Sequence, residues 1–218
     1  MSKYKIALFD CDGTIANTDT LIVETFKELY KKYRPSFNYK IEDIYYFSGP
    51  PIKLTLEHEF PFIPIQDILD EYHALSKSKY DDLIESYPDV KNVLLNLKEK
   101  GVKLGVITNK LHATTEYCLK CLGLENIFDV IIASDDVKVG KPNQEAMEKA
   151  LNFFSFFDRS KVIYVGDNKI DDDFAFNSHV DSLIMTWGPR KQVFTSHFPT
   201  YLAINFKEVE GIILYGKQ

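Results

Sequence analysis

Two aspartates directly after an apolar run form the most reactive pattern in this sequence. Asp10 and Asp12 follow residues 6–9, and Gly13 and Thr14 come next. Ionised carboxylates are costly to bury without partners, so such a pair at the carboxyl end of a strand indicates a cleft that binds cations or performs chemistry. The structural alternative is a strand-to-helix turn in which Asp12 and Thr14 cap the following helix.

Polar groups end or follow three further strand-like runs: Thr108, Asn109 and Lys110 after 102–107, Lys141 and Pro142 after 129–133, and Asp167 and Asp171 after 161–165. The carboxyl ends of parallel strands share one edge of a sheet, so groups far apart in the sequence can meet there. Pro142 suits the first turn of a helix, which would place Lys141 just before a helix start. The four segments together predict one composite site.

The order of the elements predicts an α/β fold: a doubly wound parallel sheet, Rossmann-like, with a small inserted α-helical cap. Residues 4–9 predict the first strand, and helices and strands alternate from residue 88: helices 88–100, 111–122, 143–153 and 171–177, and strands 102–107, 129–133, 161–165 and 182–186. Residues 200–214 predict a short strand and a closing helix.

The cap is predicted from an interruption of this alternation. An amphipathic helix over 18–33 and a second helix over 65–80 flank a segment broken by five prolines, Pro35, Pro50, Pro51, Pro61 and Pro64. We therefore expect a core of residues 1–16 and 87–218 and a cap of residues 17–86, with hinges near 16–18 and 86–87.

The ordered set Asp-x-Asp-Gly-Thr, a hydroxyl residue after a strand, Lys-Pro, and Gly-Asp-x-x-x-Asp resembles the four signature motifs of the haloacid dehalogenase superfamily. These motifs extend from residue 10 to residue 171. The position of the cap, between the first and second motifs, is similar to that in the phosphoglycolate phosphatase and pyrophosphatase-like branch. Departures occur after the third and fourth motifs, where Asn143 and Gln144, and residues 174–179, differ from the usual pattern.

The resemblance implies a role for each motif residue. Asp10 would be the nucleophile that forms an aspartyl-phosphate, and Asp12 the acid that protonates the leaving oxygen and then activates water. Thr108 and Asn109 would bind the transferring phosphoryl group, and Lys141 would stabilise its charge.

A Mg²⁺ cofactor is also implied, because a carboxylate attacking an anionic ester needs a cation to offset the repulsion. Oxygen ligands suit Mg²⁺, and the expected ligands are Asp10, the backbone carbonyl of Asp12, and Asp167. Asp171 would support this set. We expect Asp172 and Asp173 to belong to a solvated helix start.

Substrate selection is expected from the cap. Gly49 would let the backbone approach the substrate, and Lys53 could contact an anionic tail; a proline-bounded helix start explains this segment equally well. Arg34 and His58 are the next candidates for a recognition group in the cap.

Composition excludes several classes of protein. A net charge of −6 argues against binding to nucleic acid or to an anionic membrane. Met1-Ser2-Lys3 leads straight into a strand, and no 18-residue apolar run occurs, so we expect a cytoplasmic protein, a monomer or homodimer, that acts on a small phosphorylated metabolite.

The predicted activity is Mg²⁺-dependent hydrolysis of a small phosphate monoester, similar to phosphoglycolate. Inorganic pyrophosphatase and sugar phosphate phosphomutase are alternatives on the same scaffold. A response-regulator receiver also combines Asp, Thr and Lys on an α/β sheet, but the expected acceptor aspartate would fall where this sequence has its cap. A non-enzymatic binding protein is disfavoured because every catalytic group is present.

Overall fold

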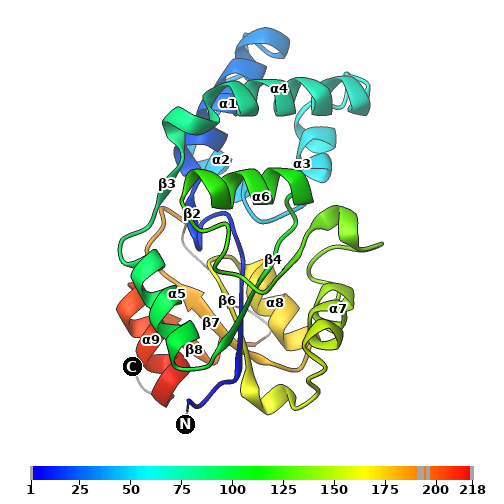
Figure 1. Cartoon of the computed structure of the whole chain (residues 1–218). Helices are drawn as coiled ribbons and strands as arrows, with labels where there is room; N and C mark the ends of the chain where they lie inside the picture. The colour runs from blue at the N-terminus through cyan, green and yellow to red at the C-terminus, as the bar shows by residue number, and fades with distance from the viewer. Residues whose placement is uncertain (1, 191–193, 195–196, 217–218) are drawn as a thin grey trace.

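A parallel six-stranded sheet forms the centre of the protein in the computed structural model, which describes residues 2–190, 194 and 197–216 (Figure 1). The strand order is β5-β4-β1-β6-β7-β8, with bounds β1 Ile6–Phe9, β4 Lys103–Ile107, β5 Val130–Ile132, β6 Val162–Gly166, β7 Asp181–Met185 and β8 Tyr201–Ala203. The first strand is central, so the chain winds outward from it in both directions. The predicted doubly wound parallel sheet is confirmed.

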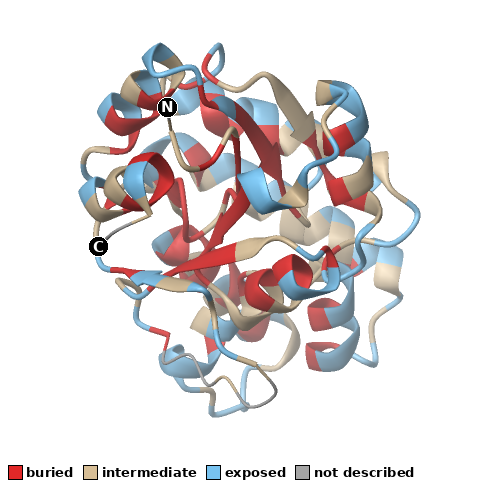
Figure 2. Cartoon of the chain, turned by 90° about the horizontal axis from the view of Figure 1, so that it is seen from below, coloured by how far each residue is buried: buried red, intermediate tan, exposed pale blue. Residues whose placement is uncertain are grey.

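Helices cover both faces of this sheet because the strand residues are apolar on both faces. Ala7 and Phe9 pack in one cluster and Ile6 and Leu8 in another, as the alternation of side chains along a strand requires. The first cluster includes residues of α5 (Val90–Glu99), α6 (His112–Cys121) and α9 (Phe206–Tyr215), and the second residues of α7 (Glu145–Phe154) and α8 (Lys169–Asn177). Figure 2 shows the buried strands at the centre and helices whose outer faces are exposed.

The helix predicted over 143–153 is present as α7, but Pro142 does not lie in its first turn. Helix α7 begins at Glu145 with Gln144 as its N-cap, not at Pro142. The Asn143 side chain accepts a hydrogen bond from the backbone N–H of Glu145 at 2.9 Å, which forms a local turn before the helix.

A second group of helices lies above the sheet in Figure 1. The chain enters and leaves it through two short paired strands, β2 (Ala16–Asn17) and β3 (Glu85–Ser86). Between them lie α1 (Asp19–Tyr33), α2 (Ile41–Ile44), the 3-10 helix Tyr45–Phe47, α3 (Ile52–Glu59) and α4 (Ile65–Leu83). The expected long helices are present, and α3 begins directly after Pro51, as the proline-bounded helix start considered for this segment requires. The β2–β3 pair was not expected. The residue boundaries of core and cap stay predictions.

The cap has an aromatic core of its own. Phe26 is fully buried there, and its ring lies 4.7 Å from that of Phe47, 5.7 Å from that of Tyr72 and 6.4 Å from that of Phe60. Such contacts add to the free energy of burial. None of the described helices is long and apolar enough to cross a membrane.

Replacing Phe26 with alanine should destabilise the cap by about 3–5 kcal/mol, because it removes the ring at the centre of this cluster. The effect is measured by unfolding the protein with denaturant and monitoring amide hydrogen exchange in α1 and α4. The matched control is Phe62→Ala, since that ring is 92% exposed and its loss should change stability little. Equal effects of the two substitutions would contradict the existence of a separate cap core.

Candidate active site

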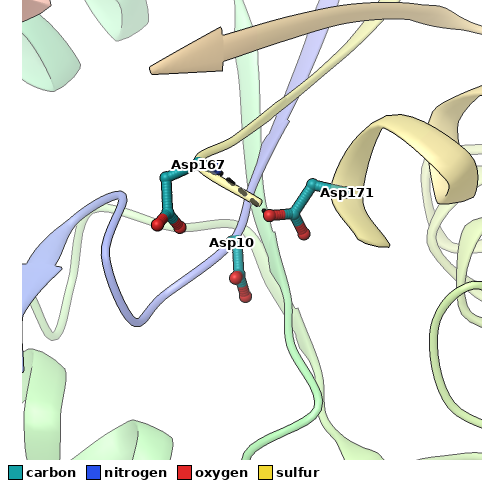
Figure 3. A group of neighbouring side chains, drawn as sticks. All are labelled: Asp10, Asp167 and Asp171. Carbon is teal, nitrogen blue, oxygen red and sulfur yellow. Dashed lines mark hydrogen bonds between the residues drawn. The ribbon is translucent and has the colours of Figure 1, made fainter. Parts of the chain in front are cut away.

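The predicted chemical groups meet at the carboxyl edge of the sheet. Asp10 follows β1, Thr108 follows β4, Asp167 follows β6, and Asp171 lies in the first turn of α8. Carboxylate oxygens of Asp10, Asp167 and Asp171 all lie within 4.8 Å of one another. Figure 3 shows the three side chains gathered at this point. Neighbouring strand ends at the point where the winding reverses thus bring together residues that are separated by more than 150 positions.

Lys141 lies between two of these carboxylates. Its Nζ atom is 2.9 Å from Asp10 Oδ1 and 2.7 Å from Asp171 Oδ1, and it also donates to the Tyr164 hydroxyl at 2.9 Å. Burial works against its charge, but Asp10 and Asp171 outweigh that effect and raise the pKa of Lys141. The ammonium group therefore keeps its charge beside the proposed nucleophile.

Asp171 fixes the turn that carries Asp167. Its Oδ2 atom accepts hydrogen bonds from the backbone N–H groups of Asp167 at 3.1 Å and Asn168 at 3.0 Å. With Lys141 on the other oxygen, both carboxylate oxygens of Asp171 are engaged. This arrangement suits the supporting role that the sequence predicts for Asp171 better than direct metal ligation.

Asp10 and Asp167 lack sufficient positive charge around them. Burial raises the pKa of Asp10 to about 7 despite Lys141, and raises that of Asp167 to about 6 despite Arg190. Each carboxyl group is therefore held in an environment that favours its neutral form.

A charge count over the described residues of the site shows an excess of negative charge in addition to this burial. Four buried carboxyl groups, those of Asp10, Asp19, Asp167 and Asp171, face two cations, Lys141 and Arg190. Two negative charges remain when all four are ionised, which one divalent cation would balance. Oxygen ligands and a charge of −2 fit Mg²⁺, and Asp10, Asp167 and the Asp12 backbone carbonyl would hold it.

Asp12 faces the cleft in an ion pair with Lys110. The Lys110 Nζ atom lies 2.8 Å and 3.0 Å from the two carboxylate oxygens of Asp12. Burial opposes the positive charge of Lys110, but the neighbouring Asp12 carboxylate helps to raise the pKa of Lys110 above its ordinary value. The sequence shows Lys110 directly after Thr108 and Asn109, but its pairing with Asp12 depends on β1 and β4 being neighbours.

A cleft of about 720 Å³ lies between the sheet edge and the cap, a size typical of small-molecule sites. The predicted residues Asp10, Asp12, Gly49, Lys53, Thr108 and Asn109 line it, together with Lys110 and Lys138. The Lys53 side chain is 60% exposed, and its Nζ atom is 3.9 Å from Glu57. Lys53 is thus in a position to contact a bound substrate.

The cap loop at Gly49 is fastened to the core by two asparagines. Asn109 Nδ2 donates to the Gly49 carbonyl at 3.0 Å, and Asn168 Nδ2 donates to the Ser48 carbonyl at 2.9 Å. Gly49 has a φ of +105°, and a Cβ there would lie 2.8 Å from Asn168 Nδ2, so the close approach requires glycine. Asn109 also accepts a hydrogen bond from the Lys141 backbone N–H at 2.8 Å. One amide side chain therefore joins the second motif, the third motif and the cap.

Two predicted recognition residues have other contacts. Arg34 Nη1 lies 3.2 Å from Glu59 Oε2, and His58 Nδ1 lies 2.9 Å from Glu59 Oε1. Both pairs lie within the cap, with the His58 side chain 85% exposed, and neither side chain is among the described residues that line the cleft.

The expectation of a solvated Asp172 is wrong. Asp172 is 1% exposed, and its Oδ1 accepts a hydrogen bond from Ser182 Oγ at 2.6 Å. Its position on α8 turns it toward β7, whereas Asp173 pairs with Lys169 at the partly exposed side of the helix. A run of three aspartates in sequence thus occupies three different environments, because successive helical residues point about 100° apart.

Arg190 is part of the site that sequence reasoning missed. Its Nη2 atom is 2.5 Å from Asp167 Oδ2 and its Nη1 atom is 2.6 Å from Asp19 Oδ1. No motif marks it, since it follows β7 in a segment without regular secondary structure. The one available signal was that arginine is rare in this sequence, where lysine predominates.

The fold and the arrangement of these four motifs define a hydrolase of the haloacid dehalogenase type. A family model described as haloacid dehalogenase-like hydrolase matches residues 7–185, and the chain belongs to this family. The predicted membership in the superfamily and the prediction of a hydrolase are confirmed.

Among individual proteins, the chain is similar to pyrophosphatase PpaX of Halalkalibacterium halodurans, with 32% identity over 207 residues that cover 94% of this chain and 95% of that protein. It is 37% identical to PpaX of Anoxybacillus flavithermus over 164 residues, or 75% of each chain.

Solved structures show the same fold. A haloacid dehalogenase-like family hydrolase from Streptococcus pneumoniae has a TM-score of 0.81 at 23% identity and covers 96% of this chain and 98% of its own. A predicted phosphoglycolate phosphatase from Haemophilus somnus has a TM-score of 0.84 at 18% identity, covering 97% and 99%. These neighbours share the fold of this chain over nearly its whole length.

The raised pKa values predict how Mg²⁺ affects stability at different pH. The folded, metal-free protein binds more protons than the unfolded chain between about pH 4 and pH 7, so Asp10 and Asp167 make folding less favourable as pH rises through this range. Mg²⁺ competes with these protons. Added Mg²⁺ should therefore raise Tm more at about pH 8 than at about pH 5.

Thermal unfolding with and without Mg²⁺ at the two pH values measures this difference. In Asp10→Asn and Asp167→Asn the Mg²⁺-induced rise in Tm should shrink at the higher pH, while Asp173→Asn serves as the control. An identical Mg²⁺ effect at both pH values in the unsubstituted protein would contradict the assignment.

Proposed function

We propose that this protein is a Mg²⁺-dependent phosphatase that hydrolyses a small phosphorylated substrate with an anionic remainder through an aspartyl-phosphate on Asp10. The observation that carries the proposal is the buried cluster in which Lys141 contacts Asp10 at 2.9 Å and Asp167 lies beside them. A lone strand-end aspartate needs none of these neighbours, whereas a nucleophile that attacks an anion needs both a cation and a second metal-binding carboxylate.

The first step is attack of an Asp10 oxygen on phosphorus, with departure of the leaving-group oxygen. Asp12 enters the first step in its protonated form and donates that proton to the leaving oxygen. The resulting carboxylate, paired with Lys110, takes a proton from the water that attacks the aspartyl-phosphate in the second step. Thr108 donates a hydrogen bond to the phosphoryl oxygens, and Lys141 offsets their charge. Bound Mg²⁺ would supply the positive charge that reduces repulsion between nucleophile and phosphate.

The cations along the cleft favour a substrate with a second anionic group. Lys53 lies on the cap side and Lys138 on the core side of the lining. Phosphoglycolate and pyrophosphate both have such a group.

Pyrophosphate is supported independently by the two relatives named pyrophosphatase PpaX, which share 32% and 37% identity with this chain. Release of free phosphate from pyrophosphate, phosphoglycolate and several sugar phosphates, with and without Mg²⁺, tests the proposal. Conversion of a sugar monophosphate to an isomer without net phosphate release would instead identify a phosphomutase.

Asp10→Asn should keep the fold but abolish turnover, because the amide is isosteric with the carboxylate and lacks the attacking anion. Circular dichroism checks the fold and phosphate release checks the activity. The matched control, Asp173→Asn, changes a half-buried aspartate of α8 that pairs with Lys169, and it should keep full activity. Substantial steady-state hydrolysis by Asp10→Asn would rule out the covalent mechanism.

Asp12→Asn should slow both chemical steps by roughly 100- to 10,000-fold, the usual contribution of a general acid–base group. The loss should be smallest for aryl phosphates with acidic leaving groups, because they need little protonation. A comparison of kcat/KM across leaving groups of graded acidity measures this. A loss that does not vary with the leaving group would exclude Asp12 as the acid.

Lys53→Ala should lower kcat/KM for phosphoglycolate or pyrophosphate by roughly ten- to a hundredfold, through loss of one charge-assisted hydrogen bond. Hydrolysis of an aryl phosphate whose aryl group is uncharged should change little. Lys31→Ala, an exposed cap lysine outside the cleft lining, is the control. If both substrate types lose activity equally, Lys53 has no part in substrate selection.

A further inference from the structure

The segment 187–190, which follows β7, contacts both places where the chain passes between sheet and cap. The Trp187 ring stacks on Tyr87, just after β3, with ring centroids 4.0 Å apart. Trp187 Nε1 also donates to the Gly13 carbonyl at 2.9 Å. In Figure 1 this orange segment rises from β7 toward β2 and β3.

Arg190 ends this segment and joins the cap to the acidic cluster. Besides its contacts with Asp167 and Asp19, its Nη1 atom donates to the Tyr45 carbonyl at 3.1 Å. Asp19 is the first residue of α1, and Tyr45 lies in the cap between α2 and α3. The guanidinium group is buried and therefore tied to this set of partners.

The surrounding backbone is shaped to admit this arginine. Gly13 has a φ of +82°, and a Cβ at this position would lie 2.3 Å from Asp167 Oδ2 and 2.6 Å from Arg190 Nη2. A side chain at residue 13 would thus displace the contact between the two groups. The planar fork of arginine can hold two carboxylates at once, which the single ammonium of lysine cannot do in the same geometry.

We propose that Arg190 is a positioning residue that couples closure of the cap to the arrangement of the Asp167 carboxylate. The inference rests on the proposed metal-binding role of Asp167. With the cap closed, the negative charge of Asp19 partly neutralises the guanidinium group. Arg190 can then hold the Asp167 carboxylate without placing its full positive charge beside it. When the cap opens, Asp19 and Tyr45 move away and the full charge of Arg190 falls on Asp167.

Hydrogen exchange of the metal-free protein tests the link between cap and core. Arg190→Met and Asp19→Asn each break the same ion pair, from opposite sides, and each should speed amide exchange in β2, in the first turn of α1 and in 41–48 by about tenfold or more. The double variant should exchange no faster than the faster single variant, because only one link is lost. The control is Arg159→Met, which removes an arginine of the core that contacts Ser178 and Glu148. This substitution should leave amide exchange in the cap unchanged.

Additive effects of Arg190→Met and Asp19→Asn, or unchanged cap exchange in both, would overturn the proposal. Asp19→Asn keeps the arginine and its contact with Asp167, so it gives a result even if Arg190→Met does not fold.

Mg²⁺ binding provides the second readout. Asp19→Asn leaves every proposed metal ligand in place, yet should weaken Mg²⁺ binding by roughly fivefold or more, since the uncompensated Arg190 charge repels the cation at Asp167. Calorimetric titration with Mg²⁺ alone measures this, with Arg159→Met again as the control. Unchanged Mg²⁺ affinity in Asp19→Asn would show that the cap contact does not reach the metal site.

Neither measurement involves turnover. The coupling can therefore fail while phosphate release still supports the proposed phosphatase. Conversely, loss of the covalent mechanism in the Asp10→Asn experiment would leave the exchange result intact.

Discussion

The pairing of Lys141 with Asp10 and Asp171 is the interaction on which the rest of this site depends. Three ionisable groups are removed from water at one point of the sheet edge, and an unpaired charge there would cost several kcal/mol. The ammonium group stabilises the two carboxylates beside it, and Asp171 in turn holds the backbone that carries Asp167. The remaining excess of negative charge is what makes this cluster suited to a divalent cation.

The cap completes the site from the opposite side and contacts the core through both polar and apolar groups. Asn109 and Asn168 hold the loop at Ser48 and Gly49, while Arg190 holds α1 through Asp19. These polar contacts join the cap to the core, whereas the aromatic core around Phe26 lies within the cap. The cap can therefore keep its internal packing while its contacts with the core change, which is the property that a closing element over an active site needs.

The acidic cluster also imposes requirements on residues that perform no chemistry. Gly13 must stay without a side chain because Asp167 and Arg190 occupy the space where a Cβ would lie. Tyr164, on β6, donates its hydroxyl to the Ile107 carbonyl at 2.8 Å while accepting a hydrogen bond from Lys141. Packing at the strand ends thus supports the residues of the proposed active site.

The sequence by itself determined the α/β class, the order of the elements and the residues of the four motifs. Apolar periodicity defines strands and helices locally, and strand-end carboxylates such as Asp10 and Asp167 stand out because they interrupt that pattern. The tertiary structure decided which polar groups meet. Asp172 was expected in solvent but faces β7, because the orientation of α8 on the sheet sets its environment. Arg190 pairs with Asp167, more than 20 residues away in the sequence, and Lys110 pairs with Asp12, nearly 100 residues away. No local signal could reveal these pairs.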